Sequence, residues 1–240
     1  TAYNAGRVGK VALERLTGIP VETDLASEFR YRDPFVNEHT LLILVSQSGE
    51  TADTLAALRE GKRKGARIFS VTNVIGSSIA RESDDVFYTW AGPEIAVAST
   101  KAYTTQLVAF YLIAMNMALL LGKMERSDYD SLLTEILALS DKIKLMLKKE
   151  SDIKQIADSI KDKNAVFYLG RNMDHNSALE GALKLKEISY IFTEAFAAGE
   201  LKHGTIALIE EGTPVITIAT QTALLDKTFS NMQEVKARGA

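Results

Sequence analysis

The apolar and polar positions along this chain follow two periods, one typical of strands and one typical of helices. Apolar runs or strict alternation, typical of strands, occur at residues 21–25, 41–45, 67–73, 85–90, 165–171, 192–196 and 214–219. Apolar residues spaced three and four apart, typical of helices, occur at residues 5–16, 52–64, 99–121, 129–149, 151–160, 178–190 and 225–237, with short helical turns at 26–32 and 77–83. Strands that alternate with helices predict parallel sheets with right-handed crossovers, and therefore an α/β fold.

The same order of elements occurs twice, on either side of a polar break at residues 122–130. We therefore expect two related three-layer domains, residues 1–123 and residues 124–240, each a parallel sheet flanked by helices. The chain enters a helical pattern at once without an initiator Met, and it ends directly after another helix. We expect a piece of a longer protein, with the second domain truncated at its C-terminus.

The composition narrows the class of protein. With 46% hydrophobic and 25% charged residues in 240, the chain is typical of a globular protein. The net charge of −3 indicates no nucleic-acid partner, and the absence of cysteine excludes disulfides and a cysteine nucleophile within these residues. The most apolar run, residues 107–121, is shorter than the roughly 20 residues of a membrane span, so we expect a core helix, no membrane partner and a cytoplasmic location.

One turn between a strand and a helix carries a cluster of hydroxyl groups. Leu41–Val45 is followed by Ser46-Gln47-Ser48-Gly49-Glu50-Thr51, and a helical pattern starts at the next residue. The first N–H groups of a helix have no partner within it and carry partial positive charge, so hydroxyls placed there suit a phosphate. An ordinary Ser/Thr-rich helix cap explains the same residues equally well.

A second loop favours the interpretation of residues 46–51 as a ligand site over that of an ordinary helix cap. Residues 91–99 also follow a strand, and ligands of parallel sheets lie beyond the carboxyl ends of the strands. Since both loops lie at such ends, we expect them to lie close together.

The predicted helix 178–190 carries Glu180, Lys184 and Glu187 on one face, at spacings of four and three. A solvated stripe of ion pairs is the simplest interpretation of that spacing. The apolar residues around it favour a mostly buried helix instead, and burial raises the pKa of a carboxyl group toward neutrality, which suits proton transfer. His203, between two nearby glycines, is the best candidate for a catalytic imidazole among the three histidines, because His39 and His175 lie in polar turns. No cluster has metal-ligand spacing, so we expect no metal and no cofactor.

Four segments resemble one enzyme family along essentially the whole chain. They are Ser46–Thr51, Glu94–Lys101, Ala178–Tyr190 and Ala198–Gly204, and in this order they resemble the isomerase half of the glutamine–fructose-6-phosphate aminotransferase (glucosamine-6-phosphate synthase) family. The first segment alone is typical of any sugar isomerase (SIS) domain. The resemblance implies two SIS domains and the ketose-to-aldose step that makes glucosamine 6-phosphate from fructose 6-phosphate, the first step of amino-sugar biosynthesis.

The resemblance also implies roles for individual residues. The sugar phosphate is held by Ser46, Gln47, Ser48 and Thr51, and the sugar is covered by Val97 and Ser99. Glu187 moves a proton between C1 and C2, and Lys184 assists at the sugar oxygens. His203 opens the sugar ring and comes from the neighbouring subunit of a homodimer.

Three departures from the family pattern bear on activity. Ala2 stands where the family usually has Ser, and Thr205 stands where Pro commonly follows His-Gly. The family's Schiff-base lysine belongs to a segment after residue 240, and its glutaminase domain, with a cysteine nucleophile, precedes residue 1. We therefore expect that these 240 residues alone do not complete the full reaction.

Other functions stay open at this point. Another SIS isomerase or a deglycase would act on a different phosphosugar with the same loop. A regulator would use an SIS domain only to sense a sugar phosphate, and it would carry a basic helix-turn-helix, which this sequence lacks.

Overall fold

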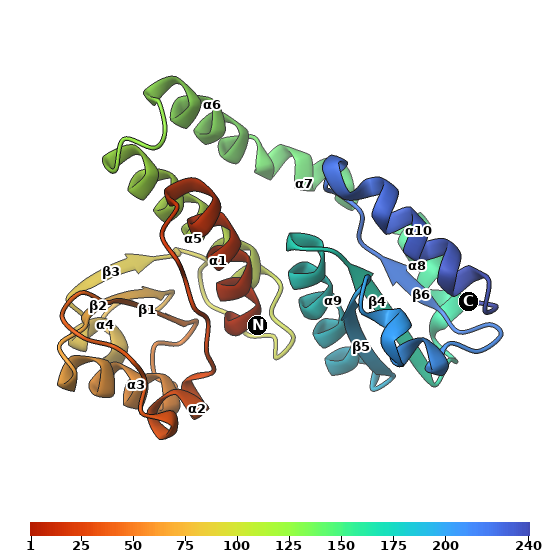
Figure 1. The fold of residues 1–240 in the computed structure, drawn as a ribbon, viewed down its shortest axis with the longest axis horizontal. Coiled ribbons are helices and arrows are strands. Elements are labelled where there is room, and N and C mark those ends of the chain that lie inside the picture. Colours follow the sequence, from red (N-terminus) through yellow and green to blue (C-terminus); the bar gives the residue numbers. More distant parts are fainter. The chain divides into compact units, whose positions relative to one another are not determined.

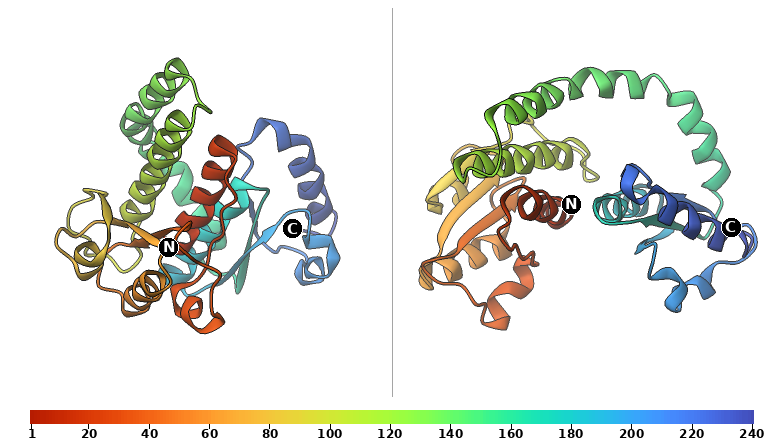
Figure 2. Two further views of the ribbon diagram at one scale, coloured as in Figure 1. Left: turned by 60° about the vertical axis from the view of Figure 1, so that its left-hand side comes forward. Right: turned by 45° about the horizontal axis from the view of Figure 1, so that its top comes forward.

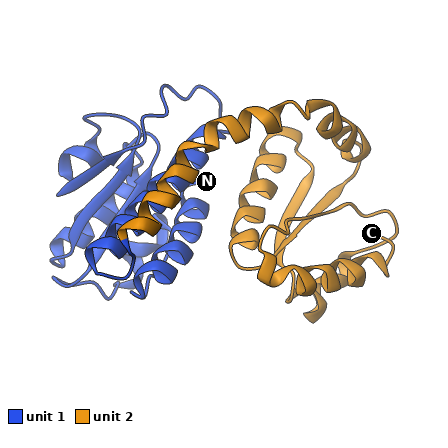
Figure 3. Cartoon of the chain, turned by 90° about the horizontal axis from the view of Figure 1, so that it is seen from above, with its two compact units in different colours: residues 1–125 blue, residues 126–240 orange.

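The computed structural model describes all 240 residues and divides them into two compact units, residues 1–125 and residues 126–240 (Figure 3). Each unit contains a three-stranded parallel sheet with helices on its faces. The α/β class expected from the sequence is confirmed.

In the first unit, the parallel sheet has the order β1-β2-β3 (Figure 1). Ser46, the last residue of β1, is level with Thr72 of β2, and Thr72 is level with Tyr88 of β3. The carboxyl ends of all three strands therefore lie at one edge of the sheet. The elements are α1 (Ala2–Thr17), α2 (Ala26–Phe29), η1 (Arg30–Arg32), β1 (Leu41–Ser46), α3 (Ala52–Arg63), β2 (Arg67–Thr72), α4 (Ser78–Glu82), β3 (Asp85–Tyr88) and α5 (Lys101–Leu120).

Strand β1 is covered on both faces, which explains its continuous apolar sequence. Ile43 and Val45 pack into the apolar cluster of α1 and α5, while Leu42 and Leu44 pack into the cluster that includes α3. Helices α1 and α5 lie side by side (Figure 2). They approach closely because Gly9 has no side chain: a Cβ there would lie 2.3 Å from the ring of Phe110.

Helix α5 is long and apolar enough to cross a membrane by length and composition. Seven of its residues are buried, and it forms part of the same apolar cluster as α1 and the sheet. These contacts are those of a core helix.

The expected strand at residues 21–25 is wrong, since these residues are not in a strand. The peptide of Val21 is held by α1 instead: its N–H donates to Glu14 at 3.0 Å, and its carbonyl accepts from Lys10. Side chains thus take the place of a neighbouring strand at Val21. A cavity of 770 Å³ lies between this segment, β1 and α1.

In the second unit, the parallel sheet has the order β5-β4-β6. The side chains of β4 alternate between its two apolar clusters: Tyr168 packs with α9, and Phe167 packs with Val235 of α10. The elements are α6 (Arg126–Leu137), α7 (Leu139–Leu147), α8 (Glu150–Ile160), β4 (Ala165–Gly170), α9 (Met173–Ser189), β5 (Phe192–Ala197), η2 (Leu201–His203), η3 (Thr205–Leu208), β6 (Val215–Thr217), η4 (Thr222–Leu224) and α10 (Leu225–Lys236).

Helix α9 begins at Met173, five residues before the predicted start at residue 178. The polar sequence of residues 172–177 suggested a turn. In the structure Asp174 is buried and accepts hydrogen bonds from the backbone and side chain of Thr220, at 2.9 and 2.5 Å. His175 therefore lies in a helix and is half-buried, and its expected place in a surface turn is wrong.

Candidate functional site

The turn after β1 is organised by its own hydroxyl groups. Ser46 is buried, and its Oγ accepts a hydrogen bond from the N–H of Gly49 at 3.0 Å. The same oxygen lies 3.0 Å from the hydroxyl of Thr51, and Ser48 Oγ accepts from the N–H of Glu50 at 3.2 Å. One hydroxyl of the Ser46–Thr51 pair donates to the other. The remaining hydroxyl of that pair and that of Ser48 each keep a proton for a ligand.

Gly49 is required by the shape of this turn. Its φ of +66° lies in the left-handed region, and a Cβ there would lie 2.0 Å from Ser77 Oγ. The backbone of the turn therefore packs directly against the segment that follows β2.

The N-terminus of α3 faces the same turn without a side-chain cap. Thr51 is the N-cap residue, yet its hydroxyl bonds to Ser46 and makes no capping bond. The first N–H groups of the helix thus lack a side-chain acceptor, and this partial positive charge suits an anion.

The one carboxylate within the turn is directed away from that helix end. Glu50 accepts a hydrogen bond from the N–H of Ser78 at 2.8 Å. Hydrogen bonds from the Ser78 side chain and backbone hold the pKa of Glu50 below its ordinary value of 4.5. Glu50 is therefore ionised and bound to the start of α4 near neutral pH.

The second loop, residues 91–100, is closed on Glu94. The carboxylate of Glu94 accepts hydrogen bonds from the hydroxyl of Ser99 and, at 3.1 Å, from the N–H of Ala96. Ser99 Oγ in turn accepts from the N–H of Ala102 at 3.2 Å, at the start of α5. The bond from Ser99 is the main reason that the pKa of Glu94 lies below its ordinary value of 4.5.

A pocket of 260 Å³ joins the two loops at the carboxyl edge of the first sheet. Three residues predicted to bind the sugar line it together: Gln47, Val97 and Ser99. The other three predicted residues, Ser46, Ser48 and Thr51, form the adjoining turn and do not line this pocket. Its full lining is Thr1, Ala2, Gln47, Glu94, Ala96, Val97, Ser99, Ala102 and Gln106.

Sequence reasoning missed Glu94 and Gln106 as site residues. Glu94 belongs to a segment that resembles the family, but its role as the acceptor that closes the loop depends on Ser99 turning back toward it. For Gln106 a signal existed, because it is an uncharged polar residue within a long apolar helix.

In the second unit, α9 brings Lys184 and two carboxylates together. Lys184 Nζ lies 2.5 Å from Glu187 Oε2 and 3.5 Å from Glu180 Oε1. The Lys184 side chain is 16% exposed, that of Glu180 4% and that of Glu187 29%. The solvated stripe is therefore wrong for this face, and Glu187 is the more exposed of the two carboxylates and the one that a ligand can reach.

His203 is exposed in η2, and Thr205 begins η3 directly after Gly204. Neither is among the residues paired with Glu187. No three His, Asp or Glu side chains of the chain are arranged to hold a metal ion.

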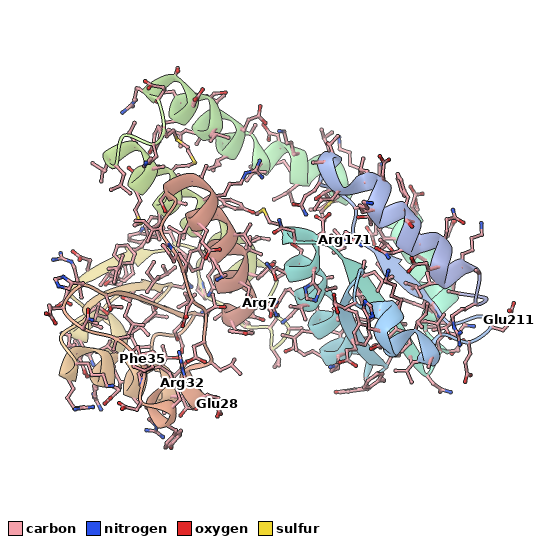
Figure 4. The ribbon with its side chains drawn as sticks, viewed as in Figure 1. Arg7, Glu28, Arg32, Phe35, Arg171 and Glu211 are labelled. Carbon is pink, nitrogen blue, oxygen red and sulfur yellow. The ribbon has the colours of Figure 1, made fainter.

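The loop after β4 has a different chemistry from the loop after β1. This loop contains a positively charged side chain, that of Arg171 (labelled in Figure 4). The guanidinium of Arg171 donates two hydrogen bonds to Asn231 Oδ1, at 2.8 and 3.1 Å. Its carbonyl accepts from Gln221 at 2.7 Å, and a Cβ at Gly199 would lie 3.0 Å from its guanidinium. Arg171 is thus committed to internal contacts.

Comparison with known proteins finds a family model and several relatives that match this chain. A sequence model of the SIS domain matches residues 1–116 and 159–240, one stretch in each unit. The glutamine–fructose-6-phosphate aminotransferase (isomerizing) of Clostridium tetani is 60% identical over 240 residues, covering 100% of this chain and 40% of that protein. The aminotransferase of the same name from Caldanaerobacter subterraneus is 58% identical over 239 residues, covering 100% of this chain and 39% of that protein.

A solved structure of a similarly named enzyme also matches this chain. The C-terminal domain of glucosamine-fructose-6-phosphate aminotransferase from Francisella tularensis superposes with a TM-score of 0.97 at 44% identity, covering 99% of this chain and 68% of that one. The chain therefore corresponds to about two fifths of the curated relatives.

Proposed function

The chain belongs to the SIS domain family, and from this premise we propose that its first unit binds a phosphosugar and its second unit carries the proton-transfer groups of a ketose-to-aldose isomerisation. The reaction is the conversion of fructose 6-phosphate to glucosamine 6-phosphate by a glutamine–fructose-6-phosphate aminotransferase. The observation that carries the proposal is the pocket lined by Gln47, Val97 and Ser99, next to the start of α3, which has no side-chain cap.

The assignment of the phosphate rests on the turn after β1. Two hydroxyl protons and the first N–H groups of α3 offer donors to phosphate oxygens, and Glu50 is directed away from them. Ser48 and Thr51 then contact the phosphate, Ser46 holds the turn in shape, and Gln47 lies between the phosphate and the sugar pocket.

The assignment of the proton transfer rests on α9. Glu187 is partly exposed and ionically paired, so its carboxylate can take a proton from C1 of the ketose-derived imine and return it to C2. Lys184 fixes the orientation of Glu187 and supplies positive charge near the sugar oxygens. His203, exposed in η2, opens the sugar ring in a second copy of the chain.

The relatives support a wider setting for this proposal. In the full-length protein we infer a glutaminase domain that releases ammonia, a homodimer, a cytoplasmic location and a place in amino-sugar biosynthesis. The name of the Clostridium tetani relative, and the 40% of its length that this chain covers, support a further domain.

The phosphate assignment is tested by calorimetric titration with fructose 6-phosphate and glucosamine 6-phosphate. Ser48→Ala should weaken both affinities by about tenfold or more, since a hydrogen bond to a charged group is lost. Ser159→Ala, an exposed serine of α8, should bind as the unaltered protein does. Unchanged affinity in Ser48→Ala would refute the phosphate site.

The catalytic assignment is tested by solvent deuterium exchange at C1 and C2 in the full-length protein. Glu187→Gln should bind sugar phosphate normally and lose the exchange. Retained exchange would remove Glu187 from this role. Binding without any exchange in the unaltered protein would favour a sugar-phosphate sensor instead of an isomerase.

A further inference from the structure

Gln106 has the properties of a ligand-binding residue, and it belongs neither to the turn after β1 nor to α9. We propose that Gln106 selects the bound sugar, its amide oxygen accepting a hydrogen bond from a hydroxyl or amino group of the phosphosugar. The proposal rests on the proposed function, because it assigns the sugar end of the same pocket.

The burial of Gln106 is the first observation. The residue is 2% exposed, and its Oε1 is shielded from solvent and accepts no hydrogen bond. Buried amide groups in proteins are almost always paired, because an unpaired one has lost its water without compensation. The same residue lines the 260 Å³ pocket, so a ligand in that pocket lies within its reach.

Two other polar side chains of α5, those of Thr105 and Asn116, behave differently. Thr105 donates to the carbonyl of Lys101 at 2.8 Å, and Asn116 donates to the carbonyl of Leu112 at 2.9 Å. Each is satisfied by its own helix. Gln106 is next to buried Ala102 and Ala109 on the face of α5 that enters the core, where a Leu or Met would pack without leaving a polar group unpaired.

The chemistry of the pocket indicates which part of the ligand Gln106 contacts. Gln106 Oε1 and the carboxylate of Glu94 are acceptors, and acceptors repel a phosphate. The donors that suit a phosphate belong to the turn after β1, which Gln47 connects to the pocket. A phosphosugar therefore places its phosphate at the turn and its hydroxyl or amino groups toward Gln106.

A small change in side-chain conformation completes the contact. The last torsion of a glutamine side chain is soft, so the amide can turn its oxygen to the pocket without moving α5. A site that holds a buried acceptor for a substrate donor discriminates strongly against ligands without that donor.

The test is calorimetry on the protein with two probes, glucosamine 6-phosphate and inorganic phosphate. Gln106→Met, which keeps the length and removes both polar atoms, should weaken glucosamine 6-phosphate binding by about tenfold. Phosphate binding should not change, and the melting temperature should be equal or higher because an unpaired buried group is gone. Asn116→Met, on the exposed side of the same helix, should alter neither affinity.

Each other result contradicts the role of Gln106, the proposed function or both. Equal sugar-phosphate affinity in Gln106→Met overturns the role of Gln106 and leaves the proposed function standing. An equal loss for both probes shows a structural role and overturns the inference as well. No binding of glucosamine 6-phosphate to the unaltered protein overturns both proposals. If Gln106→Met does not fold, Gln106→Asn, which withdraws the amide by one methylene, carries the same expectations for the two affinities.

Discussion

Single side chains at the carboxyl edge of the first sheet are bound to one another before any ligand arrives. Ser46 holds the N–H of Gly49 and the hydroxyl of Thr51, and Glu94 holds the hydroxyl of Ser99. Such internal bonds fix the directions of the donors, so a ligand meets groups that are already oriented. The two residues on which this order depends most directly are Gly49 and Glu94.

Gly49→Ala should lower the free energy of unfolding by about 2–4 kcal/mol, from the left-handed backbone and from the clash with Ser77. Gly76→Ala is the matched control. Its φ is +70° and no atom lies within 4 Å of a Cβ there, so only the backbone cost of about 1–2 kcal/mol applies. Urea denaturation compares the two, and equal losses would show that the contact with Ser77 does not matter.

The closure of the 91–100 loop should depend on pH through Glu94. The pKa of Glu94 is lowered in the folded protein, so the bond from Ser99 stabilises the loop above the ordinary value of 4.5 and is lost as the pH falls through the lower, folded value. The emission of Trp90, the single tryptophan, should change in that acid range. Glu94→Gln should lack this change, and an identical titration in the variant would assign it to another group.

At the scale of elements, the helical geometry of α9 brings three charged side chains into contact. The steps of four and three residues place Glu180, Lys184 and Glu187 on one face, and packing against β4 and β5 buries most of that face. Burial makes these charges important for stability, because a carboxylate with little access to water is stabilised by the positive charge of Lys184.

Lys184→Met should therefore lower the free energy of unfolding by about 2 kcal/mol, less than for a fully buried pair because Glu187 is partly exposed. Lys186→Met, an exposed lysine of the same helix, should change it by less than about 0.5 kcal/mol. Adding Glu180→Gln to Lys184→Met should restore part of the loss. Equal stability of the two lysine variants in urea would show that the ion pairs do not stabilise the helix.

At the scale of the whole molecule, each unit has a sheet and apolar clusters of its own, and the three helices that follow α5 in the chain differ from the other helices. No residue of α6, α7 or α8 is buried, whereas the helices that cover the sheets all contain buried residues. Segments with few buried contacts open at low free-energy cost.

Trypsin under native conditions should therefore cut first at Lys148 or Lys149, which are exposed between α7 and α8. Mass spectrometry of the first fragments identifies the site. A first cut within residues 41–120, where strands and helices are packed, would contradict this view of the local stability.

The sequence alone determined the α/β class, the positions of the six observed strands and those of most helices, and it predicted one further strand, at residues 21–25, that does not form. Burial selects apolar residues, so a strand buried on both faces, such as β1, has a continuous apolar run, and a helix buried on one side, such as α3, has apolar residues at helical spacing. It also indicated the hydroxyl turn at residues 46–51 and the charged face of α9, because both depend on neighbours close in the chain.

Only the tertiary structure decided what depends on distant partners. Val21 forms no strand because Lys10 and Glu14 bond its peptide, and α9 starts early because Thr220 satisfies Asp174. Gln106 lines the pocket because α5 lies at the edge where the loops after β1 and β3 end. The local pattern of residues does not indicate which distant segment supplies a hydrogen bond. The partners of these groups are therefore known only from the folded chain.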